Sequence, residues 1–293
     1  KEEFLEYEIS KLVHNLAKPE KALIGVFSNL PIQASVDPRN FQPTPAWVFM
    51  QQLEELFEIQ MIEDLEKDEL KDLDLLLIVH PKSLSESALY SVDQYVLSGG
   101  KLLAFVDPLA ELDQPGPGVS AIPSKSSHLN AITRKWGVAL REQKILGDPE
   151  VALLVGGADG RPVRHLGILG FSKEYLGQDN VVTSSIENIN MATAGIFDVD
   201  TSLETKVETL IRSSDGSGLL EAYQFEYLSE PEDLQKGFSS TGESFVVAAR
   251  ISGAAVSNFE GAIAGREGFI PSSENIQVML IADTDILADR LWV

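Results

Sequence analysis

Apolar residues along the chain gather in short, nearly unbroken runs, which alternate with stretches of helical spacing. Runs of strand length lie at residues 22–27, 73–79, 102–106, 245–251 and 275–282. A run that is apolar at nearly every position is typical of a strand covered on both faces, as in a parallel sheet. Apolar residues three and four apart predict helices at 46–57 and 85–97. This alternation of strands and helices predicts an α/β fold with a mainly parallel sheet flanked by helices.

The composition changes after the first third of the chain. Residues 113–118 read DQPGPG and serines follow, so the segment 112–127 is the best candidate for a boundary. We therefore expect an α/β domain at residues 1–115 and a second α/β or mixed half at 116–293. The strand predicted at 275–282 belongs either to that second half or to the sheet of the first, and the pattern leaves both open.

Weaker patterns complete the secondary-structure prediction. Apolar spacing predicts a helix, or a strand followed by a helix, at 2–16, and helices at 129–136 and 286–292. Ser85 is the expected N-cap of the helix at 85–97, and Gly99 is expected to follow its end. Short strands are expected at 152–154 and 166–169, around a tight turn formed by the sequence GGADG at 156–160. Trp136 precedes a glycine, and we expect it to be half exposed.

Three aspartates that follow predicted strands are the main candidate ligand-binding residues. Asp107 comes directly after the run at 102–106, and Asp283 and Asp285 follow the run at 275–282. Ligands of open α/β sheets lie in the crevice at the carboxyl ends of the strands. If the two strands are neighbours, the carboxylates share this crevice. The competing interpretation is local: Asp283 or Asp285 caps the following helix, and Asp107 turns the chain after its strand.

A shared acidic crevice leaves two functional alternatives open. Two carboxyl groups roughly 5–10 Å apart across a cleft can hydrolyse glycosidic bonds, so Asp107 with Asp283 or Asp285 would suit a carbohydrate-active or other hydrolase. Carboxylate oxygens are also the ligands that calcium and magnesium prefer, which would suit a divalent-cation-dependent binding module. The sequence assigns neither a metal nor another cofactor.

His80 is the fourth candidate ligand-binding residue, because it ends the predicted strand at 73–79. A catalytic dyad of His80 with Asp107 is one option, since both residues would end adjacent parallel strands. The chain has no GxSxG motif to supply a nucleophile for such a dyad. The competing interpretation is an ordinary loop residue before a proline. We predict no catalytic residues.

Charge and composition narrow the class of partner. The net charge of −22 comes from 45 acidic and 23 basic residues, which disfavours binding to nucleic acid or to an anionic membrane. The chain has no cysteine, which excludes disulfides, thiolate catalysis and cysteine-ligated metal sites. No apolar run approaches the roughly 20 residues of a membrane-spanning helix. Because the chain starts at Lys1 and ends on an apolar triplet, we expect a piece of a longer protein.

Five stretches of the chain together carry a resemblance to one known family: 12–28, 73–108, 129–152, 245–261 and 276–289. The first reads LVHNLAKPEKALIGVFS and the last reads IQVMLIADTDILAD. In this order they resemble the auxiliary, or substrate-binding, component of ABC-type transport systems associated with gliding motility. The stretches reach nearly the whole chain, although residues 157–240 match little of the family.

The resemblance implies an extracytoplasmic (periplasmic) domain, anchored in the inner membrane by helices that lie outside this fragment. Its N-terminal half is similar to a domain of intraflagellar transport proteins and to the class I glutamine-amidotransferase fold, so a flavodoxin-like or amidotransferase-like sheet is expected. Amidotransferase activity is not implied, because that fold needs a cysteine nucleophile and this chain has none. The implied function is non-enzymatic: the domain contacts the permease and ATPase subunits, or presents a small-molecule or polymer cargo.

Overall fold

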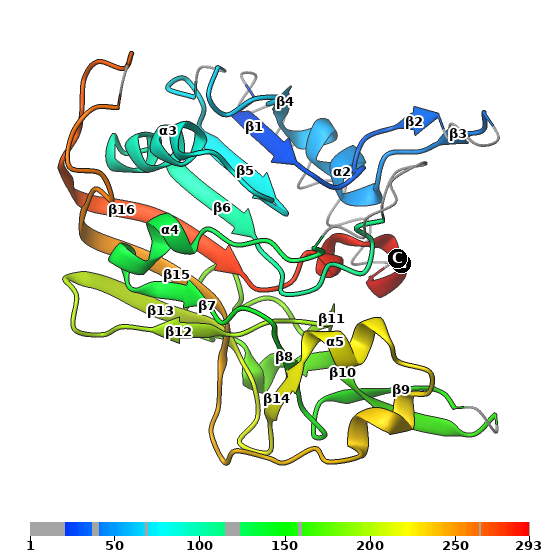
Figure 1. Cartoon of the computed structure of the whole chain (residues 1–293). Coiled ribbons are helices and arrows are strands. Elements are labelled where there is room, and N and C mark those ends of the chain that lie inside the picture. Colours follow the sequence, from blue (N-terminus) through cyan, green and yellow to red (C-terminus); the bar gives the residue numbers. More distant parts are fainter. Residues whose placement is uncertain are drawn as a thin grey trace.

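The computed structural model describes residues 21–36, 41–67, 70–114, 124–157, 160–263 and 265–292. Its main feature is a nine-stranded sheet in the order β4-β1-β5-β6-β16-β15-β12-β7, with β13 also paired to β15 (Figure 1). The helix expected within residues 2–16 lies outside the described residues. No helix in the described part of the chain is both long and apolar enough to pass through a bilayer.

A continuous part of this sheet is parallel. Strands β4, β1, β5, β6 and β16 pair in the same direction, one after another. They span Glu58–Met61, Leu23–Ser28, Leu75–Val79, Lys101–Phe105 and Ser272–Ile281. The prediction of an α/β fold with a mainly parallel central sheet is confirmed. Strand β16 corresponds to the strand predicted at 275–282, and it pairs with β6 in the sheet that the first part of the chain forms.

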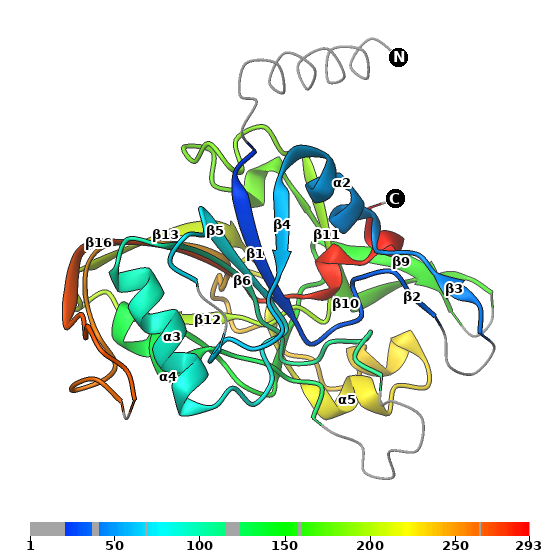
Figure 2. The ribbon, with the colours of Figure 1, turned by 90° about the horizontal axis from the view of Figure 1, so that it is seen from above.

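Both faces of the parallel strands are covered, which explains their nearly continuous apolar sequences. In β5, Leu76 and Ile78 belong to one apolar cluster with residues of helix α3, Glu86–Leu97. Leu77 and Val79 belong to a second cluster with Met50 of helix α2, Val48–Leu56. Figure 2 shows these two helices beside the strands.

The ends of helix α3 follow from its sequence. The Ser85 hydroxyl accepts a hydrogen bond from the amide of Ala88 at 3.1 Å, as an N-cap does. Gly99 follows the C-terminal end with φ of +100°, a backbone conformation that side chains other than glycine rarely adopt. Both expectations for this helix are confirmed.

The rest of the central sheet is antiparallel. Strand β15 pairs with β16, β13 and β12, and β12 pairs with β7. These strands are β15 (Val246–Val256), β13 (Thr205–Arg212), β12 (Phe197–Val199) and β7 (Val138–Leu140). The second half of the chain is therefore mixed in strand direction and has few helices.

A second layer lies against the face of the sheet that α2 also covers. It is a three-stranded antiparallel sheet in the order β11-β10-β9, and its residues Leu169, Phe171 and Met191 share an apolar cluster with Leu77. Its strands are β9 (Ala152–Gly156), β10 (Pro162–Ser172) and β11 (Asn188–Ala192). Strand β10 is much longer than the short strand expected at 166–169. Strands β9 and β10 pair antiparallel, and the turn expected at 156–160 includes residues 158–159, which lie outside the described residues.

Smaller elements complete the described chain. Two antiparallel pairs join β8 to β14 and β2 to β3. The α-helices α4 and α5 and five short 3₁₀ helices are also present in the described residues. The bounds are β2 (Ser35–Val36), β3 (Pro43–Thr44), β8 (Lys144–Gly147), β14 (Gly218–Glu221), α4 (Asn130–Thr133), α5 (Ala222–Glu226), η1 (Arg134–Trp136), η2 (Lys173–Tyr175), η3 (Pro231–Gln235), η4 (Asp285–Leu287) and η5 (Asp289–Leu291).

Two local predictions need correction. The segment 286–292 does not form an α-helix, because the chain there makes two separate 3₁₀ turns, η4 and η5. Trp136 is fully buried rather than half exposed, and its indole Nε1 lies 3.3 Å from the carbonyl oxygen of Val256. The expected helix at 129–136 is α4 followed by η1, and Gly137 ends it with φ of +89°.

Candidate functional site

The structure brings three of the four candidate residues together. Strands β6 and β16 are parallel neighbours, so the residues that follow them meet at one edge of the sheet. Asp107, Asp283 and Asp285 each place a carboxylate oxygen there, and these atoms lie within 4.8 Å of one another. All three side chains are fully buried. We call these three residues the acid cluster.

Asp107 ties the ends of the two strands together. Its Oδ2 accepts hydrogen bonds from the backbone amide and the hydroxyl of Thr284, at 2.7 and 2.6 Å. Its Oδ1 accepts a bond from the amide of Leu109 at 2.8 Å, which turns the chain after β6. The local interpretation of Asp107 therefore fits, and the same side chain also makes the long-range contact to β16.

Asp283 and Asp285 extend these contacts to other parts of the chain. Asp283 accepts a bond from the amide of Ile286 at 3.2 Å, as a helix cap does, and one from the amide of Ala192 in β11 at 2.8 Å. The Oδ2 of Asp285 accepts a bond from the amide of Glu111 at 2.8 Å. The acid cluster thus holds the segments after β6 and β16 to each other and to the second layer.

One oxygen of the acid cluster is left over. Among the described residues, the Oδ1 of Asp285 is buried and has no hydrogen-bond partner, whereas the other five carboxylate oxygens all accept bonds. Leaving a buried acceptor unpaired costs roughly 1–3 kcal/mol. This oxygen is where a proton or a cation would be accommodated.

Burial sets the charge of the acid cluster. It raises the pKa of Asp107 well above the ordinary value of 3.8, and repulsion from Asp285 adds to the rise. Burial also raises the pKa of Asp283 well above that value, with repulsion from both neighbours. The pKa of Asp285 rises to about 6, again mainly through burial. Three buried carboxylates cannot all stay ionised without a counter-charge, so the geometry favours protons shared within the group.

His80 does not form the dyad with Asp107 that the sequence left open. Its ring is fully buried, and its Nε2 lies 3.1 Å from Oδ2 of Asp113, which also contacts the ammonium group of Lys82. Burial lowers the pKa of His80, against the opposing effect of Asp113. Although burial favours the protonated acid, the bonds from Lys82 and His80 keep the pKa of Asp113 below its ordinary value.

Thr193 is a residue of this region that the sequence did not indicate. It follows β11 with φ of +53°, which is unusual for a β-branched side chain and is held only where its surroundings fix it. Its hydroxyl lies 2.8 Å from the carbonyl oxygen of Leu109 and 3.4 Å from Oδ2 of Asp285. Thr284, which Asp107 binds, was also missed, although it stands between two of the predicted aspartates in the sequence.

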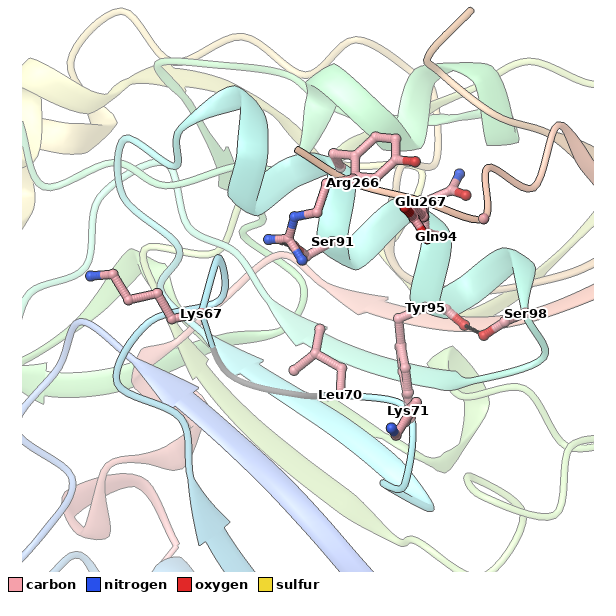
Figure 3. Close-up of a pocket in the computed structure, with 11 residues that line it drawn as sticks. Lys67, Leu70, Lys71, Ser91, Gln94, Tyr95, Ser98, Arg266 and Glu267 are labelled. Atoms are coloured by element: carbon pink, nitrogen blue, oxygen red, sulfur yellow. Dashed lines mark hydrogen bonds between the residues drawn. The ribbon is translucent and has the colours of Figure 1, made fainter. Parts of the chain in front are cut away.

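A separate pocket lies away from the acid cluster, beside helix α3 (Figure 3). Its volume is about 440 Å³. It is lined by three segments that are distant in the sequence: the connection between β4 and β5, helix α3, and the connection between β15 and β16. No local pattern in the sequence indicates this pocket, because its walls come together only in the folded chain.

Comparison with known proteins identifies one family. The model of the family described as an ABC-type uncharacterized transport system matches residues 21–293. Comparison with curated proteins gives no match.

Two solved structures are similar only at a low level. A protein described as ThuA-like, from Bacteroides uniformis, is 10% identical with a TM-score of 0.38, covering 90% of this chain and 82% of that one. A cold-adapted β-galactosidase from Rahnella sp. R3 is 10% identical with a TM-score of 0.34, covering 92% of this chain and 30% of that one. At these TM-scores neither structure bears on the fold or the function of the chain.

Proposed function

Since the chain belongs to the family of auxiliary components of ABC-type transport systems, we propose that it is a non-enzymatic extracytoplasmic domain of such a system. The family match over residues 21–293 is the observation that carries this proposal. Under this proposal, the domain lies in the periplasm, is anchored to the inner membrane through segments beyond this sequence, and works with the permease and ATPase subunits. It contacts the permease or presents a cargo. A link to gliding motility is the narrower form of the proposal.

The geometry of the acid cluster supports a role without catalysis. A glycosidase needs its two carboxyl groups roughly 5–10 Å apart and facing a cleft that admits the sugar. One carboxylate oxygen from each residue of this cluster lies within 4.8 Å of the other two, the side chains are fully buried, and backbone amides donate most of the hydrogen bonds to them. These contacts suit a structural tie between layers better than a hydrolytic site.

Divalent-cation binding is the second candidate function, and one observation favours it. The three carboxylates are close enough to share an ion, and Oδ1 of Asp285 has no other partner in the described part of the chain. Carboxylate oxygens suit calcium in particular, which tolerates irregular arrangements of oxygen ligands. The effect of calcium on thermal stability, argued below, separates this candidate from shared protons.

The absence of cysteine from the chain allows a direct test of location and partner together. Phe41 lies two residues before β3 in the β2–β3 hairpin, whose strands extend from the body of the molecule (Figure 1, Figure 2), and 81% of its surface is exposed. A Phe41→Cys variant of the full-length protein would be labelled in spheroplasts of the source organism. The reagent is a membrane-impermeant maleimide that carries a photo-crosslinker.

We expect the variant to be labelled in unbroken spheroplasts and to crosslink to a permease, with the ATPase recovered alongside it. The unsubstituted protein is the control for labelling of other thiols, because residues 1–293 offer none. Labelling only after lysis would refute the extracytoplasmic location. Tyr227, which follows α5 and is 79% exposed, provides a second labelling position as Tyr227→Cys. Efficient crosslinking to unrelated proteins alone, from both positions, would refute the association with a transporter.

A further inference from the structure

An apolar groove lies between helix α2, strand β11 and the turns η4 and η5 at the end of the described chain. Its volume is about 370 Å³. We call it the C-terminal groove, and its apolar lining residues are Phe49, Ile189, Ile286, Leu287, Leu291 and Trp292. None of these side chains is fully buried, and Trp292 is 44% exposed. A concave apolar surface that is open to water marks a place where another apolar group binds.

The walls of the C-terminal groove are fixed to one another. The carboxylate of Asp289 in η5 accepts a hydrogen bond from the amide of Val48 at 3.0 Å, which ties the start of α2 to the end of the chain. The side-chain amide of Asn190 in β11 donates a bond to the carbonyl oxygen of Leu291 at 2.9 Å. The groove is therefore formed before anything binds, which lowers the entropy cost of filling it.

The first part of the sequence supplies an apolar stripe that needs a partner. Residues 1–20 lie outside the described residues, and the pattern predicts a helix, or a strand followed by a helix, at 2–16. The stripe has the three- and four-residue spacing of one helix face and consists of Leu5, Ile9, Leu12, Val13 and Leu16. A helix of this length is marginally stable alone in water and is stabilised mainly by packing of its apolar face.

The position of Lys21 brings this stripe within reach of the groove. The Lys21 ammonium donates a hydrogen bond to the carbonyl oxygen of Glu54, near the end of α2, at 2.9 Å. Phe49 lies five residues earlier in the same helix, about 7.5 Å along its axis. Residues 17–20 can span up to about 13 Å, and a helix over 5–16 adds about 18 Å. Figure 2 shows α2 between the start of β1 and the C-terminal end of the chain.

We propose that residues 5–16 form a helix whose apolar stripe docks in the C-terminal groove of the same chain. The short connection through residues 17–20 gives this segment a high effective concentration at the groove, which favours it over a second copy of the chain. Docking would bring the two ends of the sequence to one face of the domain. The proposal concerns contacts within this chain and does not depend on the association with a transporter.

The rate of thiol labelling tests whether the stripe covers the groove. Because the chain has no cysteine, Asn188→Cys places a single thiol in the lining and leaves every apolar wall intact. We expect Ile9→Glu in this background to raise the rate of reaction with a maleimide about fivefold or more, since the docked segment is then populated at least about four times as much as the free one in its absence. Ser10→Glu makes the same change in charge one position away from the stripe and should leave the rate unchanged.

Tyr227→Cys, outside the groove, is the control for general changes in reactivity, and its rate should be the same with either glutamate substitution. Equal rates for the thiol of Asn188→Cys with and without Ile9→Glu would overturn the proposal. Equal increases caused by Ile9→Glu and Ser10→Glu would overturn it as well, because they would show an effect of charge rather than of the stripe.

Crosslinking identifies the occupant of the groove independently of those substitutions. The double variant Glu6→Cys, Asn188→Cys is treated with a short bismaleimide at low and at high protein concentration, and the linked peptides are mapped by mass spectrometry. We expect a link within one chain at both concentrations, and none in the control pair Glu6→Cys, Tyr227→Cys. Links between chains alone, increasing with concentration, would assign the groove to a second copy and overturn the proposal, as would the absence of any link.

Discussion

Asp285 is the member of the acid cluster in which charge and hydrogen bonding are easiest to separate. Its Oδ2 accepts a hydrogen bond from the amide of Glu111, while its Oδ1 is buried and has no partner among the residues that the structure describes. In Asp285→Asn the amide oxygen can keep the first contact, and the amide nitrogen replaces the unpartnered oxygen. A rise in pKa from 3.8 to about 6 corresponds to roughly 3 kcal/mol. We expect urea denaturation at pH 8 to show a free energy of unfolding that is higher by up to about that amount.

The matched control at the same residue is Asp285→Ala. It removes the charge as well, but it also leaves the buried amide of Glu111 without an acceptor, so we expect a loss of about 1–3 kcal/mol instead of a gain. If Asp285→Asn destabilised the protein as much as Asp285→Ala, the negative charge itself would be required. That result would contradict protonation as the means by which this cluster is neutralised.

At the scale of elements, the parallel strands could be predicted because two covered faces impose an apolar residue at almost every position. Strand β10 could not be predicted at its full length, because glycines interrupt its apolar pattern. Gly167 is one of them, and a Cβ atom there would lie 2.3 Å from the ring of Phe225. The glycine is needed for a contact with α5, 58 residues away in the sequence. In the local sequence pattern, a glycine that is needed for a distant contact looks only like an interruption of the strand.

Helix α3 is attached to the rest of the fold by a buried carboxylate in its middle. Asp93 is fully buried and accepts bonds from the Ser257 hydroxyl at 2.7 Å and from the backbone and side chain of Asn258, both at 3.1 Å. Asp93→Ala would leave these donors unpaired. We expect a loss of about 3 kcal/mol by urea denaturation, because bonds to a charged acceptor are the stronger ones.

The N-cap of the same helix gives a comparison for Asp93→Ala. Ser85→Ala removes the cap contact to Ala88, which is typically worth about 1 kcal/mol. We therefore expect the substitution of Asp93 to cost clearly more than that of Ser85. Equal costs would mean that the connection between β15 and β16 contributes little to holding α3 in place.

At the scale of the whole molecule, the sequence predicts those residues of the candidate site that the pairing of strands in the sheet brings together. Asp107 and Asp283 follow strands, and the parallel pairing of those strands brings them together. The partners that come from the second layer, Ala192 and Thr193, were not predictable, because nothing in the local pattern shows that β11 packs there. The partner of His80 was missed for a similar reason: Asp113 lies in a segment that the pattern indicates only as a loop.

The acid cluster links the stability of the whole fold to pH. Because the pKa values of the acid cluster are raised, the folded protein binds more protons than the unfolded chain above pH 3.8. The contribution of the acid cluster to the stability of the fold is therefore complete below that pH and is lost as pH rises through the folded pKa values. Burial also lowers the pKa of His165, a buried residue of β10. The lowered pKa values of His80 and His165 act in the opposite direction, because the unfolded chain then binds more protons up to about pH 6.5. Wild type and Asp285→Asn contain the same histidines, so the histidine contribution drops out when their free energies of unfolding are subtracted. We expect this difference in free energy of unfolding to grow from near zero at pH 4 to roughly 3 kcal/mol at pH 8.

Calcium distinguishes the two ways of neutralising the cluster, because an ion that binds only the folded state must raise its melting temperature. If protons neutralise it, the melting temperature at pH 8 after chelation stays the same when calcium is added at about 5 mM, in wild type and in Asp285→Asn alike. If the cluster is a cation site, calcium raises the melting temperature of wild type and not of the variant, and the pH-dependent difference between the two shrinks with calcium present. We expect the first result, since five of the six carboxylate oxygens already accept hydrogen bonds within the fold.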